Sequence, residues 1–230
     1  MTAVQPAYGR RIAILLVCVF FVGPALFVGY QAVQTLRVLT RVERERDAWQ
    51  RPSDILQRLN VKEGSVVVDL GCGAGYFALK LSPIVGTHGA VLAEDIRFES
   101  LAFLWIRRFV RIARNVRVIR GEADDPHLPP VPVDAVLIAN TYHELHRPTA
   151  ILSLVRRAMT HGGRLVVVDR GPRRNGDGTR DATTRRHELR LETAADEITQ
   201  SGFEIVDRDD RFIDRSADDD IWWLIVARKP

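Results

Sequence analysis

The chain has 230 residues, 46% of them hydrophobic and 27% charged, and it carries a formal net charge of +4. This ordinary globular mixture predicts one folded domain with a real core, plus an appendage. The two cysteines, Cys18 and Cys72, lie too far apart to make a disulfide framework, and no Cys/His cluster suggests zinc, so we predict no metal site.

Residues 12–30 are the first predicted element, an uncharged run of 19 positions. As a helix this run spans roughly 28 Å, close to the ~30 Å hydrocarbon core of a bilayer. We therefore predict a transmembrane anchor within residues 10–36, preceded by a short tail at residues 1–9. A cleaved secretory signal and a buried core helix are the alternatives. The run is longer than the apolar region of a signal, and no small-residue cleavage site is evident.

Arginines flank the predicted anchor unequally. Two precede it, whereas Arg37, Arg41, Arg44 and Arg46 follow it. Because positively charged flanks stay in the cytoplasm, this asymmetry predicts that the C-terminal side is cytoplasmic. Residues 37–52 alternate in charge and are predicted to be a linker or a short polar helix leading into a folded domain at residues 53–230.

Strand and helix patterns alternate through the folded domain. This alternation predicts an α/β, Rossmann-like, doubly wound and mostly parallel sheet. The last two predicted strands have no room for a helix between them, so they form an antiparallel pair. Strands are predicted at residues 65–70, 89–95, 116–122, 133–141, 164–171, 203–212 and 220–229, and helices at 52–60, 75–85, 97–115, 147–163 and 192–202.

A glycine-rich stretch, DLGCGAG, follows the first of these strands and runs from Asp69 to Gly75. In an open α/β sheet such a loop lies at the carboxyl ends of the strands, where ligands bind. A dinucleotide fingerprint requires a small residue where Tyr76 stands, and the P-loop motif is absent. The spacing therefore argues against both phosphate-binding loops and disfavours an NAD-dependent oxidoreductase.

The pattern D-x-G-x-G-x-G, in VVVDLGCGAGYFALKLS, resembles the first motif of the class I S-adenosylmethionine-dependent methyltransferases. GAVLAEDI, GEADDPHLP, VDAVLIANTYHEL and LVRRAMTHGGRLVVVD resemble the following segments of that family, although Thr160 and His161 replace its usual Lys-Pro. The resemblance covers about residue 49 to the C-terminus. It implies seven strands in the order 3-2-1-4-5-7-6 with the last one antiparallel, and S-adenosylmethionine as cofactor.

The resemblance also implies the cofactor contacts. Three glycines admit the methionine end of the cofactor, and Asp69 attracts its ammonium group. Asp95 holds the ribose hydroxyls, with Glu94 as an adjacent competitor, and Asp124 contacts the adenine amino group, with Asp125 as the fallback. The implied cofactor-binding residues are Asp69, Gly71, Gly73, Gly75, Asp95, Asp124 and Asn140.

Residues 140–146, NTYHELH, follow the fourth strand, where the family places the acceptor and the methyl group. His143 is the candidate general base, because the pKa of a histidine can lie near neutrality. Tyr142 is the second catalytic candidate, expected to shape the pocket or to donate a hydrogen bond. Glu144 is expected to orient His143 or to begin the next helix, and His187 is a further pocket candidate. The alternative is that His143 is an ordinary loop histidine. Adenine or amide methylation is not supported, because the stretch lacks both prolines of the family's [ND]-P-P-[FY] motif.

Residues 171–186 are rich in Gly, Thr, Asp and Arg without a hydrophobic period, so they are predicted to form a mobile loop and a candidate lid. Together these features predict a membrane-anchored methyltransferase that acts on a small or lipid-soluble acceptor near the cytoplasmic leaflet. A non-catalytic S-adenosylmethionine-binding scaffold is the second hypothesis. No nucleic-acid partner is expected, because no RNA-binding module accompanies the fold.

Overall fold

The computed structural model describes residues 20, 22–172, 180–215 and 218–230 of the chain. The chain divides into two units, residues 1–48 and 49–230. The second unit begins close to the point at which the sequence pattern changes from charged to alternating strand and helix.

The first unit contains most of helix α2 (Gly23–Trp49), which has no buried residue. The predicted linker at residues 37–52 is therefore helical for most of its length. Residues 10–19 and 21 of the predicted anchor lie outside the described residues. Among the residues that the structure does describe, none of the helices combines the length and the apolar character needed to cross a bilayer.

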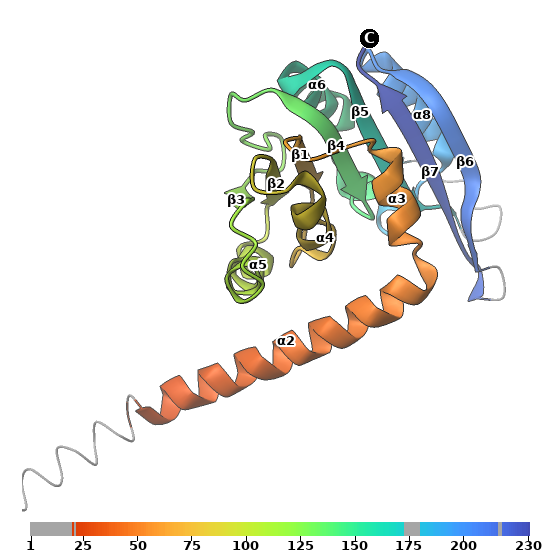
Figure 1. Ribbon diagram of the computed structural model, residues 1–230. Helices are drawn as coiled ribbons and strands as arrows, with labels where there is room; N and C mark the ends of the chain where they lie inside the picture. Colours follow the sequence, from red (N-terminus) through yellow and green to blue (C-terminus); the bar gives the residue numbers. More distant parts are fainter. Residues whose placement is uncertain (1–19, 21, 173–179, 216–217) are drawn as a thin grey trace, which may run out of the picture. The chain divides into compact units, whose positions relative to one another are not determined.

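Seven strands form one sheet in the second unit, in the order β3-β2-β1-β4-β5-β7-β6 (Figure 1). The first five strands are mutually parallel, and β7 is antiparallel to both β5 and β6. The predicted sheet order and the antiparallel last strand are confirmed. The strands are β1 (Val66–Leu70), β2 (Ala90–Asp95), β3 (Val116–Arg120), β4 (Val133–Ala139), β5 (Met159–Arg170), β6 (Glu204–Arg215) and β7 (Asp220–Arg228).

Helices cover both faces of the sheet (Figure 1). Neighbouring valines of β1 belong to different buried clusters, Val67 to the one that includes α4 and α5 and Val68 to the one that includes α6 and α8. Successive strand side chains point to opposite faces, so the uninterrupted apolar run of β1 needs cover on both sides. The helices are α3 (Pro52–Arg58), α4 (Tyr76–Val85) and α5 (Phe98–Val110) on one face, and α6 (Pro148–Ala158) and α8 (Leu191–Gln200) on the other.

Several element boundaries differ from the sequence prediction. Helix α6 ends at Ala158 rather than at the glycines, because Met159 turns to an extended conformation and pairs with Val133 to begin β5. Helix α5 ends before Ile112, whose φ of 55° is incompatible with a right-handed helix. Part of the predicted loop is helical, as α7 (Arg180–Thr184), while residues 173–179 lie outside the described residues.

The parallel strands place their carboxyl ends along one edge of the sheet. There β1 ends at Leu70, β2 at Asp95, β4 at Ala139 and β5 at Arg170. The glycine loop follows β1, and a single turn of 3-10 helix, η2 (Tyr142–Glu144), follows β4. This edge is where an open α/β sheet binds its ligands.

Candidate functional site

A cavity of about 300 Å³ opens at this edge of the sheet. That volume is at the lower end of what small-molecule sites use, roughly 300–1,000 Å³. Its walls come from the ends of β1 and β2, from the loops after β3 and β4, and from the last residue of α7 and the turn that follows this helix. The polar side chains among its lining belong to Glu94, Asp95, Arg97, Glu122, Thr141, Glu144, His146, Thr184 and His187.

The three glycines of the loop have three different roles. An added Cβ at Gly71 (φ 73°) would lie 2.3 Å from the Thr141 side chain, so Gly71 permits close packing against the loop after β4. An added Cβ at Gly75 would lie 2.3 Å from Leu104 of α5, so this glycine serves helix packing. Only at Gly73 (φ 55°) would a Cβ meet no heavy atom within 4 Å. Of the three, Gly73 alone leaves open space for an added Cβ, whereas Gly71 is the one that lines the cavity.

Asp95 lies at the end of β2 and is 3% exposed. Its Oδ2 accepts a hydrogen bond from the Gly73 amide at 2.8 Å, and its Oδ1 accepts one from the Arg97 amide at 2.8 Å. The carboxylate therefore ties the glycine loop to the turn after β2 while it lines the cavity. Asp69, which the sequence also singles out, is buried one residue before the end of β1.

The structure does not place Asp124 at the cavity. Its carboxylate points toward Arg147 at 3.9 Å, and the fallback Asp125 accepts a hydrogen bond from the His127 amide. Glu122 lines the cavity instead. Asn140 is also absent from the lining; it is exposed, with a φ of 58°. The predicted cofactor roles of Asp124 and Asn140 therefore have no geometric support.

Glu94, offered by the sequence only as a competitor of Asp95, also lines the cavity and is 3% exposed. Its Oε2 accepts a hydrogen bond from the Gly71 amide at 3.4 Å. Burial raises the pKa of Glu94 to about 8, and the carboxylates of Asp95 and Asp69 add to this rise, against the lowering effect of the Gly71 amide. Glu94 therefore carries a proton through most of the neutral range.

Replacing Glu94 with glutamine is expected to stabilise the fold at pH 8 and to change little at pH 4.5. With a folded-state pKa of about 8 against an ordinary 4.5, the folded chain binds more protons than the unfolded chain between those values. The free energy of unfolding of the wild type therefore falls as the pH rises through that window. The upper limit of the gain at pH 8 is on the order of 4 kcal/mol.

Urea denaturation of both chains at pH 5 and pH 8 measures this difference. A gain that is the same at both pH values would contradict a raised pKa for Glu94.

His143 and Asp169 form a buried pair beside the cavity. The Nδ1 atom of His143 lies 2.8 Å from Oδ1 of Asp169, and the His143 amide donates to Oδ2 at 2.9 Å. Burial by itself lowers the pKa of His143, but hydrogen bonds with Asp169 and Glu144 outweigh it and raise the pKa to about 9. His143 is thus mostly protonated at neutral pH, which weakens the prediction that it serves as a free base.

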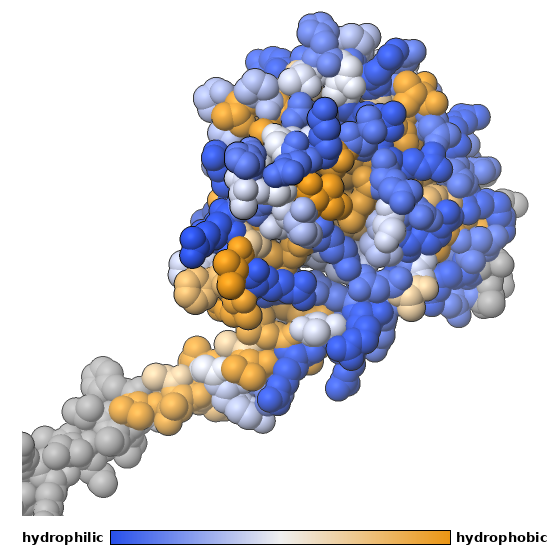
Figure 2. Space-filling view, viewed as in Figure 1, coloured by the Kyte–Doolittle hydropathy of each residue, from blue (hydrophilic) through white to orange (hydrophobic). Residues whose placement is uncertain are grey.

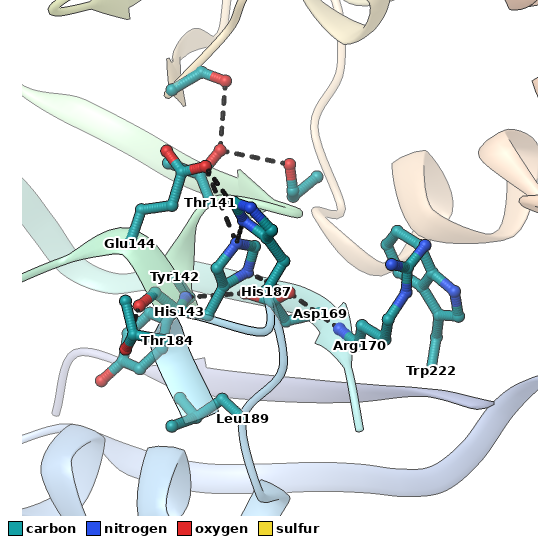
Figure 3. A network of polar contacts seen from close by, with 12 residues as sticks. Thr141, Tyr142, His143, Glu144, Asp169, Arg170, Thr184, His187, Leu189 and Trp222 are labelled. Atoms are coloured by element: carbon teal, nitrogen blue, oxygen red, sulfur yellow. Dashed lines mark hydrogen bonds and ion pairs between the residues drawn. The ribbon is translucent and has the colours of Figure 1, made fainter. Parts of the chain in front are cut away.

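The other ring nitrogen of His143, Nε2, faces two side chains that line the cavity (Figure 3). It lies 3.2 Å from Nδ1 of His187 and 3.7 Å from Oε1 of Glu144. The same Glu144 oxygen lies 3.8 Å from Nδ1 of His187. The structure therefore brings together three residues that the sequence named as pocket candidates, although His187 is 44 positions from His143.

Tyr142 is fully buried in the core and does not line the cavity. The Arg180 guanidinium lies 5.9 Å from the centre of its ring. Burial and the nearby Glu197 carboxylate raise the pKa of the Tyr142 hydroxyl above its ordinary value. The predicted role of Tyr142 in the pocket therefore has no support from this geometry, because its side chain packs into the core.

Several residues at the site were missed by sequence reasoning, among them Glu122, Thr141 and Asp169. Asp169 is one residue from the end of β5, as Asp95 ends β2, so the rule that strand ends share one edge could have found it. Thr141 lines the cavity, and its hydroxyl donates to the Gly71 carbonyl at 3.3 Å. A lone threonine after a strand gives no signal in the sequence.

A sheet of this order, with a glycine loop after β1 and a buried carboxylate at the end of β2, defines the class I methyltransferase fold. The model of the methyltransferase domain family matches residues 61–207, more than half of the chain. The chain belongs to this family, which confirms the resemblance seen in the sequence. S-Adenosylmethionine is its cofactor.

Curated and solved relatives agree with this membership. The ubiquinone/menaquinone biosynthesis C-methyltransferase UbiE of Azotobacter vinelandii is 32% identical over 110 residues, which are 47% of this chain and 44% of that protein. The chain thus matches less than half the length of this relative. An Aquifex aeolicus SAM-dependent methyltransferase shares the fold with a TM-score of 0.66 at 23% identity, over 78% of this chain and 90% of that one.

A further structure shares the fold and was solved with the cofactor. Haemonchus contortus phosphoethanolamine N-methyltransferase 2 in complex with S-adenosylmethionine has a TM-score of 0.66 at 17% identity, covering 79% of this chain and 53% of that one. The residues here fit the same cofactor, because Gly73 has open space beside it and Asp95, which accepts its amide, presents a buried carboxylate to the cavity.

Proposed function

We propose that this chain transfers a methyl group to a small or lipid-soluble acceptor and that it is held at the cytoplasmic face of a membrane by residues 12–30. The observation that carries methyl transfer is the hydrogen bond between the amide of Gly73, which has open space beside it, and buried Asp95, whose carboxylate lines the cavity. In this proposal the Asp95 carboxylate accepts hydrogen bonds from the ribose hydroxyls of the cofactor. Gly73 leaves room for its methionine end, and Glu122 contacts its adenine in place of Asp124. The cofactor supplies an activated methyl group on a sulfonium.

The acceptor is proposed to enter on the side of Glu144 and His187. Both line the cavity, whereas His143 lies behind them and is 1% exposed. His143 therefore acts as a positioning residue in this proposal, holding Glu144 and His187 in place through the contacts of its Nε2. Methyl transfer from a sulfonium chiefly requires that the acceptor be aligned and water excluded.

The surface of α5 supports a lipid-soluble acceptor. Hydrophobic side chains gather over this helix on the face seen in Figure 2. Ile96, which lines the cavity, is itself 51% exposed and directly precedes them in the chain. Apolar and aromatic side chains beside arginines are typical of surfaces that rest on anionic bilayers. The exposed residues are Phe98, Trp105, Phe109, Val110 and Ile112, with Arg111, Arg114 and Arg117 close in sequence.

Incubating the chain with S-adenosylmethionine labelled in its methyl group and with membrane or soluble extracts tests this function. We expect a labelled product from the membrane extract, identified by mass analysis. Binding of S-adenosylmethionine without transfer to any extract would favour the non-catalytic scaffold instead. Protease accessibility in oriented membrane vesicles tests the location, and a domain on the outer side would contradict it.

Replacing Gly73 with alanine is expected to weaken binding of S-adenosylhomocysteine about tenfold or more, because the methyl fills the space through which the ligand reaches the backbone. The strain of a positive φ also costs about 1 kcal/mol of stability. Gly162 is the matched control, since its φ is 76° and an added Cβ there also meets nothing within 4 Å.

The Gly162→Ala chain is expected to show the same loss of stability with unchanged affinity, since Gly162 lies near the amino end of β5. Thermal melts and calorimetric titration measure the two quantities. Equal affinities of the two alanine variants would contradict the role of Gly73.

A further inference from the structure

We propose that His143, Glu144 and His187 form a binding site for one divalent metal ion of the zinc type, open to the cavity at its fourth position. The donor atoms of these three residues all lie within 4.8 Å of one another. Figure 3 shows the three side chains converging on one point between η2 and the segment after α7. The proposal rests on the proposed function in one respect only: the fourth ligand of the ion is taken to be an oxygen or sulfur atom of the methyl acceptor.

The separations of the donor atoms are close to those around a tetrahedral ion, within about 0.2 Å. Nε2 of His143 lies 3.2 Å from Nδ1 of His187, and Oε1 of Glu144 lies 3.7 Å and 3.8 Å from these two nitrogens. Around a tetrahedral ion with bonds of about 2.0–2.2 Å, any two ligand atoms lie roughly 3.3–3.6 Å apart. Adjacent ligands of an octahedral ion with similar bonds lie nearer, at about 3 Å. The observed set therefore suits zinc better than an octahedral ion.

Asp169 supplies the support that a metal-binding histidine needs. It lies 2.8 Å from Nδ1 of His143, on the side of the ring away from Glu144 and His187, and it is 0% exposed. A carboxylate in this position fixes the ring and its tautomer, so that Nε2 presents its lone pair to the ion. Glu144 and Asp169 together balance the charge of a divalent cation. In the metal-free chain Glu144 faces protonated His143 and also Arg97, which lines the same cavity.

The backbone holds His187 in place for this role. Its φ of 55° is left-handed, a conformation that costs energy in a residue other than glycine. The His187 amide donates to the Thr184 carbonyl at 2.9 Å, while the Thr184 hydroxyl donates to the His143 carbonyl at 2.8 Å. These bonds dock α7 and the turn after it onto η2, so the two histidines meet although the chain between them is long.

The ligand set also points to a site that exchanges its fourth ligand. Two histidines and one glutamate are a combination found in catalytic zinc sites, whose remaining position holds water or substrate. Glu144 and His187 both line the cavity, so that position faces the space where the acceptor is proposed to bind. An ion there would hold an acceptor oxygen or sulfur as the anion.

Titration of the purified full-length chain with Zn²⁺ against a chromogenic chelator, in the absence of any methyl donor, tests the site. We expect one ion per chain and, with Co²⁺, the visible absorption of a tetrahedral site. His187→Ala and Glu144→Gln are expected to weaken uptake at least tenfold, and Asp169→Asn about 10- to 100-fold. The His187 side chain is 67% exposed, so its removal leaves the fold intact, as a thermal melt will show.

His146→Ala is the matched control, because His146 lines the same cavity but lies outside the cluster. Its uptake of Zn²⁺ is expected to equal that of the wild type. No uptake by the folded wild type, uptake unchanged in His187→Ala and Glu144→Gln, or equal loss in His146→Ala would each overturn the site. Because the experiment measures metal uptake, a chain that takes up no metal would refute the metal site without bearing on methyl transfer. Zinc uptake without any binding of S-adenosylmethionine would refute the proposed function alone.

Discussion

Replacing Asp95 with alanine is expected to weaken binding of S-adenosylmethionine roughly 10- to 100-fold, because hydrogen bonds to a buried carboxylate contribute about 1.5–3 kcal/mol. The substitution also removes the acceptor of the Gly73 amide, which lies 2.8 Å from Oδ2, so the glycine loop loses its tie to β2. The lost ribose contact acts on the ligand-bound state, whereas the lost tie to the glycine loop acts on the free chain as well. Calorimetric titration of the folded variant measures the loss.

Asp124→Ala is the matched control for Asp95. It removes a carboxylate that the family resemblance assigns to the cofactor but that the structure turns toward Arg147. Its affinity is expected to equal that of the wild type within about twofold, the precision of such titrations at a surface site. Equal losses in the two variants would contradict the arrangement of the cavity, and an unchanged affinity in Asp95→Ala would refute the ribose contact.

Replacing Asp169 with alanine is expected to destabilise the fold by about 3–5 kcal/mol, the usual cost of removing one partner of a buried charged pair. Three donors lose their acceptor: the His143 ring, the His143 amide and the Arg170 amide, at 2.8, 2.9 and 2.7 Å. Both side chains of the pair are almost completely excluded from water. For a domain of this size the melting temperature is expected to fall by roughly 10 °C.

Glu204→Ala is the control for this experiment, since it also removes a carboxylate from an ion pair. Glu204 pairs with Arg228 at 2.6 Å, but both side chains are about half exposed, at 52% and 49%. Such surface pairs contribute about 0–1 kcal/mol. If Asp169→Ala cost no more than Glu204→Ala in urea denaturation, the buried pair would not organise η2 as described.

The sheet and the edge that binds the cofactor could be predicted from the sequence because both follow from local patterns. Apolar runs such as that of β1 mark strands buried on both faces, and parallel strands must end at one edge. The glycines and the acidic end of β2 were therefore placed correctly without any knowledge of long-range contacts.

The acidic residue that lines the cavity after β3 could not be predicted, because the choice among successive acidic residues depends on the shape of one turn. The amide of Glu122 donates to the Asp125 carbonyl at 2.7 Å, and the Asp125 amide donates back at 3.3 Å. This tight pairing turns Asp124 outward and leaves Glu122 at the cavity. Nothing in the stretch GEADD fixes that geometry in advance.

Only part of the cluster of His143, Glu144 and His187 could be predicted from the sequence. His143 and Glu144 are adjacent in a recognisable segment, but His187 arrives through α7, whose sequence has no hydrophobic period. Helix α7 is held by side-chain bonds to backbone carbonyls of η2, for example from Arg180 to Tyr142 at 3.3 Å. Interactions of this kind are set by tertiary structure, and a pattern of apolar residues cannot reveal them.

Calorimetric titration of the full-length chain with S-adenosylhomocysteine and, separately, with NAD tests the central claim most directly. The cavity described here predicts that one S-adenosylhomocysteine binds per chain and that NAD does not bind, because the third small residue of a dinucleotide loop is replaced by Tyr76. Absence of S-adenosylhomocysteine binding to the folded chain, or tighter binding of NAD, would contradict it.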